Sequence, residues 1–257
     1  MSLITGIALP NVKRFFRPDP GYIMFDVDLA GADAQVVAWE ADDESLKKAF
    51  RDYAAGTGPK IHCINAKDIF GDLAGPDGKR DPFYSRAKAG VHLTNYNGQA
   101  KTCATALNIS IPAAEAFQAR WFRLHPGIKK WHERIWNELL TTRTVSNKFG
   151  FTRTFFGRIT TKTLGEALAW IPQSSVALII NYGYCNLTEN YPEVENLLQV
   201  HDSLTGQCPI PLWPEMKPLI KKALEIPVPY DDPLIIPTSL KTSKVSWGDC
   251  KAEAWDD

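Results

Sequence analysis

Two aspartates lie where the sequence predicts that strands end, and their carboxylates could bind metal ions. Asp28 ends the apolar segment 22–28, and Asp202 lies in the short segment His201-Asp202-Ser203 between two further apolar segments. Burying an unpaired carboxylate costs several kcal/mol, so each aspartate needs a partner. Two carboxylates that meet at strand ends form an oxygen site that suits Mg²⁺. Either aspartate taken alone is better explained by a turn in which it accepts backbone N–H groups.

A second set of residues repeats every four positions along one predicted helix. The set consists of Tyr84, Lys88, His92 and Tyr96. This spacing places the four side chains on one helical face. The lysine could bind phosphates and the flat rings could pack on a nucleobase, which indicates a nucleotide site. An amphipathic helix whose lysine packs its methylene groups on apolar surface would show the same pattern.

The charges balance over the whole chain but not along it. The 257 residues contain 29 Lys and Arg and 29 Asp and Glu, which excludes a uniformly acidic or basic protein. Residues 80–163 contain 14 basic and 4 acidic residues, and acidic residues are in excess on both sides of this block. A basic block fits a surface that binds a polyanion, and acidic flanks suit metal ions. Solvated helices with scattered lysines and arginines would explain the block equally well.

The composition is that of a globular protein. Apolar residues make up 44% and charged residues 23%, which excludes a disordered or fibrous chain. The five cysteines form no Cys-x-x-Cys pair, which argues against a zinc knuckle and fits reduced thiols. The longest uninterrupted apolar run, residues 176–180, is too short to cross a bilayer, and the first residues do not resemble a signal peptide. We therefore expect a cytoplasmic protein without membrane partners.

The elements that must position these side chains follow from apolar periodicity and turn residues. A strand is predicted over 22–28, a hairpin over 143–161, and two strands over 194–200 and 204–208. Helices are predicted at about 31–54, 59–70, 82–95, 98–107, 112–124, 126–141, 164–189 and 214–224, followed by a final strand or loop. This order predicts an α+β fold that is interrupted by a helical insertion.

Several segments, taken in order, resemble family A DNA polymerases of the bacterial DNA polymerase I type. The segment from Asp28 to Ala38 resembles motif A, and Lys88-x-x-x-His92-x-x-x-Tyr96 resembles motif B. Three more resemble the Gly-Arg element, the Pro-Gln element and motif C: Phe156-Gly157-Arg158, Ile171-Pro172-Gln173-Ser174 and Gln199-Val200-His201-Asp202. The order and spacing match from about residue 10 to the end. The histidine in motif B is more similar to phage members than to bacterial ones.

The resemblance implies an α+β polymerase fold. Its palm, an antiparallel sheet backed by helices, would comprise residues 1–79 and 143–257, and a helical fingers subdomain would be inserted at 80–142. The thumb and the exonuclease that precede the palm in the family are absent from these 257 residues. The chain would therefore be an expressed fragment, a short natural polymerase or one half of a split enzyme.

The resemblance also assigns catalytic and metal-binding roles. Asp28, Asp202 and the backbone carbonyl of Leu29 would hold two Mg²⁺ ions, for which Mn²⁺ can substitute. Two metals activate the primer 3′-hydroxyl and neutralise the pyrophosphate during phosphoryl transfer. Lys88 matches the lysine that contacts the triphosphate and can protonate the leaving pyrophosphate.

Further positions are implied to bind the nucleotide and the DNA. His92 would pack on the incoming nucleotide and Tyr96 would lie near the template base. Asp33 occupies the sugar-gate position, where a side chain crowds a 2′-hydroxyl and favours dNTPs over rNTPs. The implied DNA contacts are Asn95, Arg158, Gln173 and His201.

The sequence departs from the family at the triphosphate. Tyr84 stands where the family usually has an arginine. Arg86 lies roughly 200° around the helix from it, so it cannot simply substitute, whereas Arg80 in the preceding loop could reach the phosphates. Asp33 is one methylene shorter than the usual glutamate, so exclusion of ribose could be looser.

The resemblance therefore implies a DNA polymerase core that binds primer–template DNA and dNTPs. A single-subunit RNA polymerase shares the palm and the His-Asp-Ser motif, but Asp33 argues against it. The other alternative is a catalytic half, or an inactive DNA-binding fragment, that needs a separate thumb–exonuclease chain. An exposed apolar surface at the N-terminal edge would favour that alternative. Without a thumb we expect low processivity and salt-sensitive DNA binding.

Overall fold

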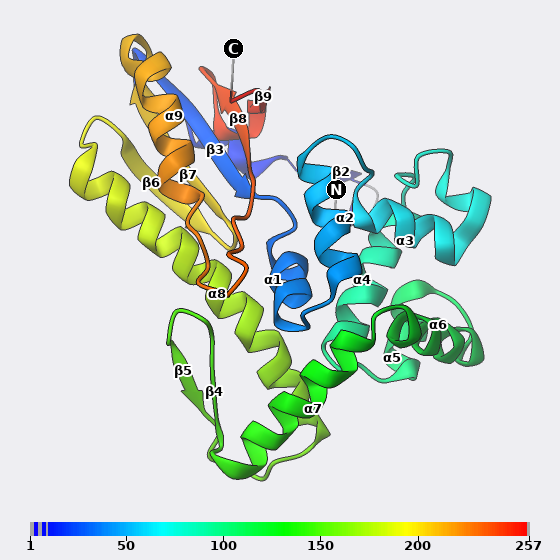
Figure 1. Cartoon of the computed structure of the whole chain (residues 1–257). Coiled ribbons are helices and arrows are strands. Elements are labelled where there is room, and N and C mark those ends of the chain that lie inside the picture. Colours follow the sequence, from blue (N-terminus) through cyan, green and yellow to red (C-terminus); the bar gives the residue numbers. More distant parts are fainter. Residues whose placement is uncertain (1–2, 5–6, 9, 256–257) are drawn as a thin grey trace. The chain divides into compact units, whose positions relative to one another are not determined.

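The computed structural model describes residues 3–4, 7–8 and 10–255, and the chain divides into two compact units (Figure 1). We call the first the sheet unit; it comprises Met1–Ala30, Val176–Val228 and Ile235–Asp257. The second, the helical unit, comprises Gly31–Ser175 and Pro229–Leu234. The division falls inside one long helix, so each unit contains part of it.

The sheet unit is built on a five-stranded antiparallel sheet in the order β6-β7-β3-β8-β9. Its strands are β3 (Tyr22–Leu29), β6 (Glu195–Val200), β7 (Ser203–Pro209), β8 (Thr238–Ser243) and β9 (Lys251–Glu253). The unit also contains the pair β1 (Leu3–Ile4) and β2 (Ile7–Ala8) and the helix α9 (Trp213–Leu224). The central strand, β3, is almost continuously buried, which explains its apolar sequence.

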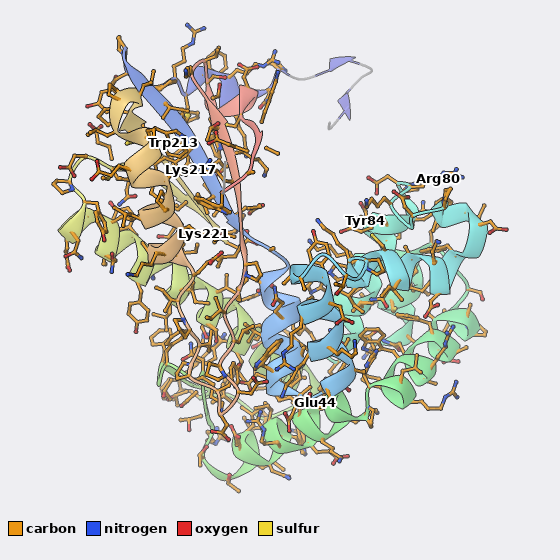
Figure 2. All side chains as sticks on the ribbon, turned by 45° about the horizontal axis from the view of Figure 1, so that its top comes forward. Glu44, Arg80, Tyr84, Trp213, Lys217 and Lys221 are labelled. Atoms are coloured by element: carbon orange, nitrogen blue, oxygen red, sulfur yellow. The ribbon has the colours of Figure 1, made fainter. Side chains whose placement is uncertain are left out.

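The core of the sheet unit lies between β3, β7 and α9. The ring of Phe25 is fully buried and stacks on Trp213 at a centroid distance of 6.0 Å. Trp213 is the first residue of α9 (Figure 2). A Cβ atom on Gly206 of β7 would lie 2.4 Å from the Phe25 ring, so glycine is required there. Gly183 similarly lets the long helix approach Leu224 at the end of α9.

The helical unit consists mainly of sequential helices. They are α1 (Ala32–Glu40), α2 (Glu44–Ala54), α3 (Ile61–Phe70), α4 (Phe83–Asn95), α5 (Ala100–Leu107), α6 (Ile111–Leu124), α7 (Pro126–Thr141) and the first part of α8 (Thr161–Asn190). A short hairpin of β4 (Thr144–Ser146) and β5 (Thr152–Thr154) lies between α7 and α8. Pro112 and Pro126 lie in the first turns of α6 and α7, where proline suits a helix.

The helix predicted over 31–54 is wrong in one respect, because it is two helices. Asp43 interrupts it as the N-cap of α2, where its Oδ1 accepts the backbone N–H of Leu46 (3.1 Å). An aspartate at this position satisfies a helix donor that has no partner inside the helix. The segment predicted as a final strand or loop forms β8 and β9, and β8 completes the sheet beside β3.

The long helix α8 bears on the expectation that the chain does not cross a membrane. By length and composition it could cross a membrane, although no uninterrupted apolar run in the chain is long enough. Of its most apolar 18-residue window, 56% is buried inside the protein. The core helix of a soluble protein passes the same test, so α8 is weak evidence for a membrane span.

Candidate metal and nucleotide sites

The two aspartates predicted to bind metal ions meet in the sheet unit. Asp28 lies near the end of β3 and pairs in register with Ser203, the first residue of β7. The hairpin turn between β6 and β7 places Asp202 directly before that residue. The backbone N–H of Leu29 donates to the carbonyl oxygen of Asp202 (2.9 Å), which fixes the turn against the end of β3. Both aspartates are partly exposed, so a ligand can reach their carboxylates.

The electrostatics of this pair show that it carries excess negative charge. Burial and the neighbouring Asp202 carboxylate raise the pKa of Asp28. Asp26, two residues earlier on the same strand face, adds to this effect. Lys241 on β8 opposes it, with its Nζ atom 3.7 Å from Asp28 Oδ2. Among the described residues, Lys241 therefore neutralises only part of the negative charge of Asp28 and Asp202.

The donor set fits a hard divalent cation that also binds a substrate. Among residues 3–4, 7–8 and 10–255, no group of three or more His, Cys, Asp and Glu side chains could hold a metal alone. Magnesium is commonly held by one or two carboxylates together with water and substrate phosphates. Asp28, Asp202 and the Leu29 carbonyl would supply the protein part of such a site.

His201 precedes Asp202 in a strained backbone conformation. Its φ is +55°, in the left-handed region that residues other than glycine seldom adopt. This conformation costs about 1 kcal/mol, and such strain is often kept where a turn must hold a functional residue. The side chain of His201 is exposed, as a residue that contacts DNA must be.

The predicted row of side chains forms on α4 in the helical unit. The rings of His92 and Tyr96 approach each other with a centroid distance of 6.0 Å. Lys88, one turn earlier, is exposed. Burial lowers the pKa of His92 to about 4, and the Lys88 ammonium contributes to the same shift. His92 is therefore neutral at pH 7.

The structure adds His62 of α3, which the sequence analysis missed. Its ring lies 6.3 Å from that of Tyr84 and 5.8 Å from that of His92, so it joins two residues of the row. His62 is 6% exposed, and neither ring nitrogen has a hydrogen-bond partner among the described residues. Burial, His92 and Lys88 lower its pKa to about 3. The buried imidazole of His62 and the partly buried imidazole of His92, both neutral at pH 7, therefore lie together near Lys88.

Tyr96 and Asp33 influence each other within this unit. Asp33 lies in the first turn of α1, and its charge, after burial, helps to raise the pKa of the Tyr96 phenol. The Tyr96 hydroxyl is buried and has no hydrogen-bond partner among the described residues. The Asp33 carboxylate therefore lies close enough to the Tyr96 phenol to act on it electrostatically.

The two candidate arginines differ in their surroundings. The Arg86 guanidinium lies over the Phe83 ring at 5.9 Å. Figure 2 shows Arg80 on the loop before α4 and Tyr84 in the first turn of that helix. Arg80 is exposed and lines a shallow cleft with Lys67, so it remains accessible to an anion.

Asn95 requires a correction, because its side chain faces the protein interior. It is 2% exposed, and its Oδ1 accepts the indole N–H of Trp121 (2.8 Å). Its carbonyl oxygen also lies 2.7 Å from His132 Nε2. Asn95 therefore joins the end of α4 to α6 and α7 and is not placed to contact DNA. Two other residues predicted to bind DNA, Arg158 and Gln173, are exposed.

Sequence comparisons find DNA polymerases among the relatives of this chain. A thermostable DNA polymerase I of Thermus filiformis is 29% identical over 237 residues, 87% of this chain and 27% of that protein. A DNA polymerase of Mycobacterium phage D29 is 30% identical over 154 residues, 57% of this chain and 24% of that protein. The chain thus spans about a quarter of the length of the curated relatives it matches.

A solved structure shows the same fold. The POL domain of Pol1 from M. smegmatis, in complex with DNA primer-template and dNTP, matches 91% of this chain and 41% of its own length. The TM-score is 0.75 and the sequence identity is 21%. The helix-rich architecture with an antiparallel sheet is therefore that of a polymerase domain. The model of DNA polymerase family A matches residues 6–248, nearly the whole sequence, and the chain belongs to that family.

Proposed function

We propose that the chain is the catalytic core of a template-directed DNA polymerase that adds dNTPs to a primer 3′ end. The observation that carries this proposal is that Asp28 and Asp202 lie together at one end of the sheet, where burial and then the Asp202 charge raise the pKa of Asp28. Two carboxylates held together at this cost need a cation to balance them. When bound, two Mg²⁺ ions would activate the primer hydroxyl and neutralise the leaving pyrophosphate.

The residues of the carboxylate pair hold positions that such a reaction needs. Asp28 and Asp202 would supply carboxylate oxygens and Leu29 a carbonyl oxygen. The hydrogen bond from Leu29 to Asp202 keeps β3 and the hairpin turn in register, so the carboxylates need little rearrangement before binding. Lys241 would neutralise part of the charge until the ions and the substrate arrive.

The row on α4 is proposed to bind the incoming nucleotide. Lys88 would contact the triphosphate and donate a proton to the leaving pyrophosphate. His62 would bind a phosphate oxygen through a ring N–H that has no partner in the protein. His92 and Tyr96 would pack on the nucleotide, and Asp33 would crowd a 2′-hydroxyl. Arg80 is the proposed substitute for the arginine that the family has at Tyr84.

Primer–template DNA and dNTPs are the proposed substrates, and the cytoplasm, or the host cytoplasm for a phage protein, is the proposed location. Residues 80–163, with 14 basic and 4 acidic residues, would supply most phosphate contacts. Gln173, His201 and Arg158 would contact the DNA near the primer end. We keep the division into palm (1–79 and 143–257) and fingers (80–142) as a proposal.

Primer extension tests the proposal. Wild type, Asp202→Ala and the surface control Asp52→Asn are incubated with a short primer–template, Mg²⁺, and either dNTPs or rNTPs. Among the described residues, the Asp52 side chain forms a solvent-exposed ion pair with Lys48, whose loss should change little. We expect extension with dNTPs by the wild type and the control, and none by Asp202→Ala. Equal extension by Asp202→Ala, or a preference for rNTPs, would contradict the proposal.

A second candidate function is a catalytic half that works with a separate thumb–exonuclease chain. It is favoured by an exposed apolar edge in the sheet unit. Val12 is 64% exposed, Phe15 78% and Phe16 47%. Isolated exposed apolar residues are common, but a contiguous group marks a surface that another chain or domain covers.

The extension assay also separates these two functions. Products from the isolated chain would show that no partner is needed for catalysis. If Asp28 and Asp202 bind Mg²⁺, as measured by calorimetry, but no primer is extended, the partner-dependent function is supported. Phe15→Ser should then leave Mg²⁺ binding unchanged, because Phe15 is on the exposed edge and not at the carboxylate pair.

A further inference from the structure

One aromatic side chain of the helical unit is held almost completely in solvent. Phe156, just after β5, is 88% exposed, the highest value among the large hydrophobic side chains of the described residues. No aromatic ring or cation of those residues stacks on it, whereas the neighbouring Phe155 is 6% exposed and lies under Arg153 (4.7 Å). Exposing a phenylalanine costs the free energy that its burial would gain, roughly 1.5–3 kcal/mol. A ligand that covered the ring of Phe156 would recover this free energy.

The backbone that carries this ring is clamped by Arg143. Its Nη1 atom donates to three successive carbonyl oxygens, those of Phe155 (3.4 Å), Phe156 (3.1 Å) and Gly157 (3.0 Å). The backbone of Arg143 itself adopts a φ of +58° directly after α7, where glycine is the usual residue. An arginine at this position costs backbone strain, which the three hydrogen bonds of its side chain to residues 155–157 offset.

The other end of the hairpin is anchored by a buried asparagine. Asn147 is 4% exposed; its Oδ1 accepts the N–H groups of Phe149 and Phe151, both at 3.1 Å. Its Nδ2 donates to Ser174 Oγ on α8 (3.0 Å). Ser174 adjoins Gln173, which is exposed and proposed to contact DNA. The hydrogen bond from Asn147 to Ser174 thus holds the β4–β5 hairpin (Figure 1) beside Gln173.

The sequence on both sides of Phe156 is basic, which favours a polyanion as its ligand. Residues 143–163 contain five basic residues, Arg143, Lys148, Arg153, Arg158 and Lys162, and no acidic residue. Arg158, two residues after Phe156, is exposed. Aromatic rings among basic side chains are the pattern that binds single-stranded nucleic acid, because rings stack on bases while cations meet phosphates. A protein partner would have to present acidic residues of its own to this basic segment. No other feature of the hairpin favours a protein over a nucleic acid.

We propose that the ring of Phe156 stacks on an unpaired nucleobase of the DNA. Arg143 is the positioning residue, because its hydrogen bonds fix the backbone that keeps this ring in solvent. The inference rests on the proposed function, of which it names a further DNA-binding residue. An unpaired base has a free face, whereas the bases inside a duplex are already stacked. Phe156 therefore binds single-stranded DNA, such as a template that has not yet been copied, in preference to a blunt duplex.

Binding of a fluorescently labelled oligonucleotide of twelve thymidines measures this contact. Phe156→Ala should weaken binding by roughly fivefold to a hundredfold, the range for loss of one base–aromatic stack. Phe156→Trp should bind at least as tightly as wild type, and Phe156→Leu should bind nearly as weakly as Phe156→Ala. Because the ring is exposed, these variants should unfold at the wild-type temperature.

Two controls separate stacking from other effects. Phe151→Ala removes a ring that is 54% exposed but already stacks on Trp170 (5.6 Å), so binding should change less than twofold. An oligonucleotide with abasic sugars in place of its bases should bind wild type and Phe156→Ala equally. Phe156→Ala should also leave the slope of log affinity against log salt unchanged, whereas Arg158→Ala should reduce it by about 0.7.

The role of Arg143 has its own variant. Arg143→Lys retains the charge but cannot present a planar guanidinium to three carbonyl oxygens. It should weaken binding of the thymidine oligonucleotide without changing the salt slope or the binding of the abasic one.

The outcomes distinguish this inference from the proposed function. If the wild type extends primers but Phe156→Ala binds single-stranded DNA as tightly as the wild type, only the stacking inference is wrong. The same conclusion follows if Phe156→Leu binds like the wild type, since burial of any apolar group would then suffice. If the wild type binds neither single-stranded DNA nor primer–template, both are wrong.

Discussion

The backbone N–H of Leu29 donates to the carbonyl oxygen of Asp202 across a gap of 173 residues in the sequence. This bond joins the end of β3 to the turn of the β6–β7 hairpin, so that the Asp28 and Asp202 side chains share one end of the sheet. Burial first, and then the proximity of the Asp202 carboxylate, raise the pKa of Asp28. The ionised Asp28 therefore lowers the folding stability of the metal-free protein, and such a trade-off between stability and activity is common at functional sites.

Asp28→Asn should stabilise the metal-free protein while abolishing primer extension. The pKa of Asp28 is raised in the folded state, so its ionised form lowers folding stability above that pKa, and the penalty disappears as pH falls below the ordinary value. We expect a gain at pH 7 of less than about 1 kcal/mol, because the half-exposed carboxylate is screened by solvent. Urea unfolding with EDTA measures it. Added Mg²⁺ should reduce the difference, and a loss of stability in Asp28→Asn would contradict the prediction.

Acid should destabilise the helical unit through three histidines whose pKa values are lowered by desolvation. The pKa is lowered to about 3 for His62 and to about 4 for His92 and His132, whereas unfolded histidine titrates near 6.5. The unfolded chain therefore takes up protons first, so stability is complete above pH 6.5 and falls toward pH 4. The loss at pH 5 should be about 1–2 kcal/mol per histidine.

The measurement for this prediction is urea unfolding of the wild type and His62→Phe at pH 7.5 and pH 5. His62→Phe should lose less stability between the two pH values than the wild type does. Comparing each protein with itself removes the effect of the larger ring on packing. An equal loss in both proteins would show that His62 is protonated in the folded state, or that it is not buried as the structure has it.

Asp33→Ala should relax the discrimination between dNTPs and rNTPs. A side chain at this position crowds a 2′-hydroxyl, and a pocket that excludes one extra hydroxyl by shape discriminates by about tenfold to a hundredfold. The ratio of kcat/KM for a dNTP to that for its rNTP should therefore fall by about that factor. Asp52→Ala, on the exposed face of α2, is the matched control and should leave the ratio unchanged. An unchanged ratio in Asp33→Ala would remove Asp33 from the nucleotide site.

Gly206→Ala should destabilise the sheet unit by about 1–3 kcal/mol, the usual cost of overpacking. The new Cβ atom would lie 2.4 Å from the Phe25 ring and 2.7 Å from the Glu195 carbonyl oxygen, and the ring cannot move because it stacks on Trp213. Gly157→Ala is the control, since nothing lies within 4 Å of its Cβ position. Its unfolding free energy should stay within about 0.5 kcal/mol of the wild type. Thermal or urea unfolding compares them.

Much of the carboxylate pair and of the row on α4 could be predicted from the sequence. Asp28 and Asp202 were found because strand ends and turns have local signatures, in which apolar segments stop at polar turn residues. The row of Tyr84, Lys88 and His92 was found because the helical repeat is also local. The break between α1 and α2 was missed although Asp43 is a common N-cap residue, because the helical pattern continues on both sides of it.

Other features depend on contacts between residues that are distant in the sequence. His62 joins the row only because α3 packs beside α4 and brings its ring within 5.8 Å of His92, 30 residues away. Asn95 has the polarity of a surface residue, but the indole N–H of Trp121 gives it a partner in the interior. The final segment becomes β8 because β3, more than 200 residues earlier, offers it a strand edge.

Local propensity thus determined which residues form strands, turns and helices, and placed the reactive side chains at their ends and along one face. Burial, and with it the pKa values of His62 and Asp28, was decided only by the tertiary structure. The physical reason is that desolvation and charge proximity depend on every neighbour in space, whereas a sequence pattern records only neighbours along the chain.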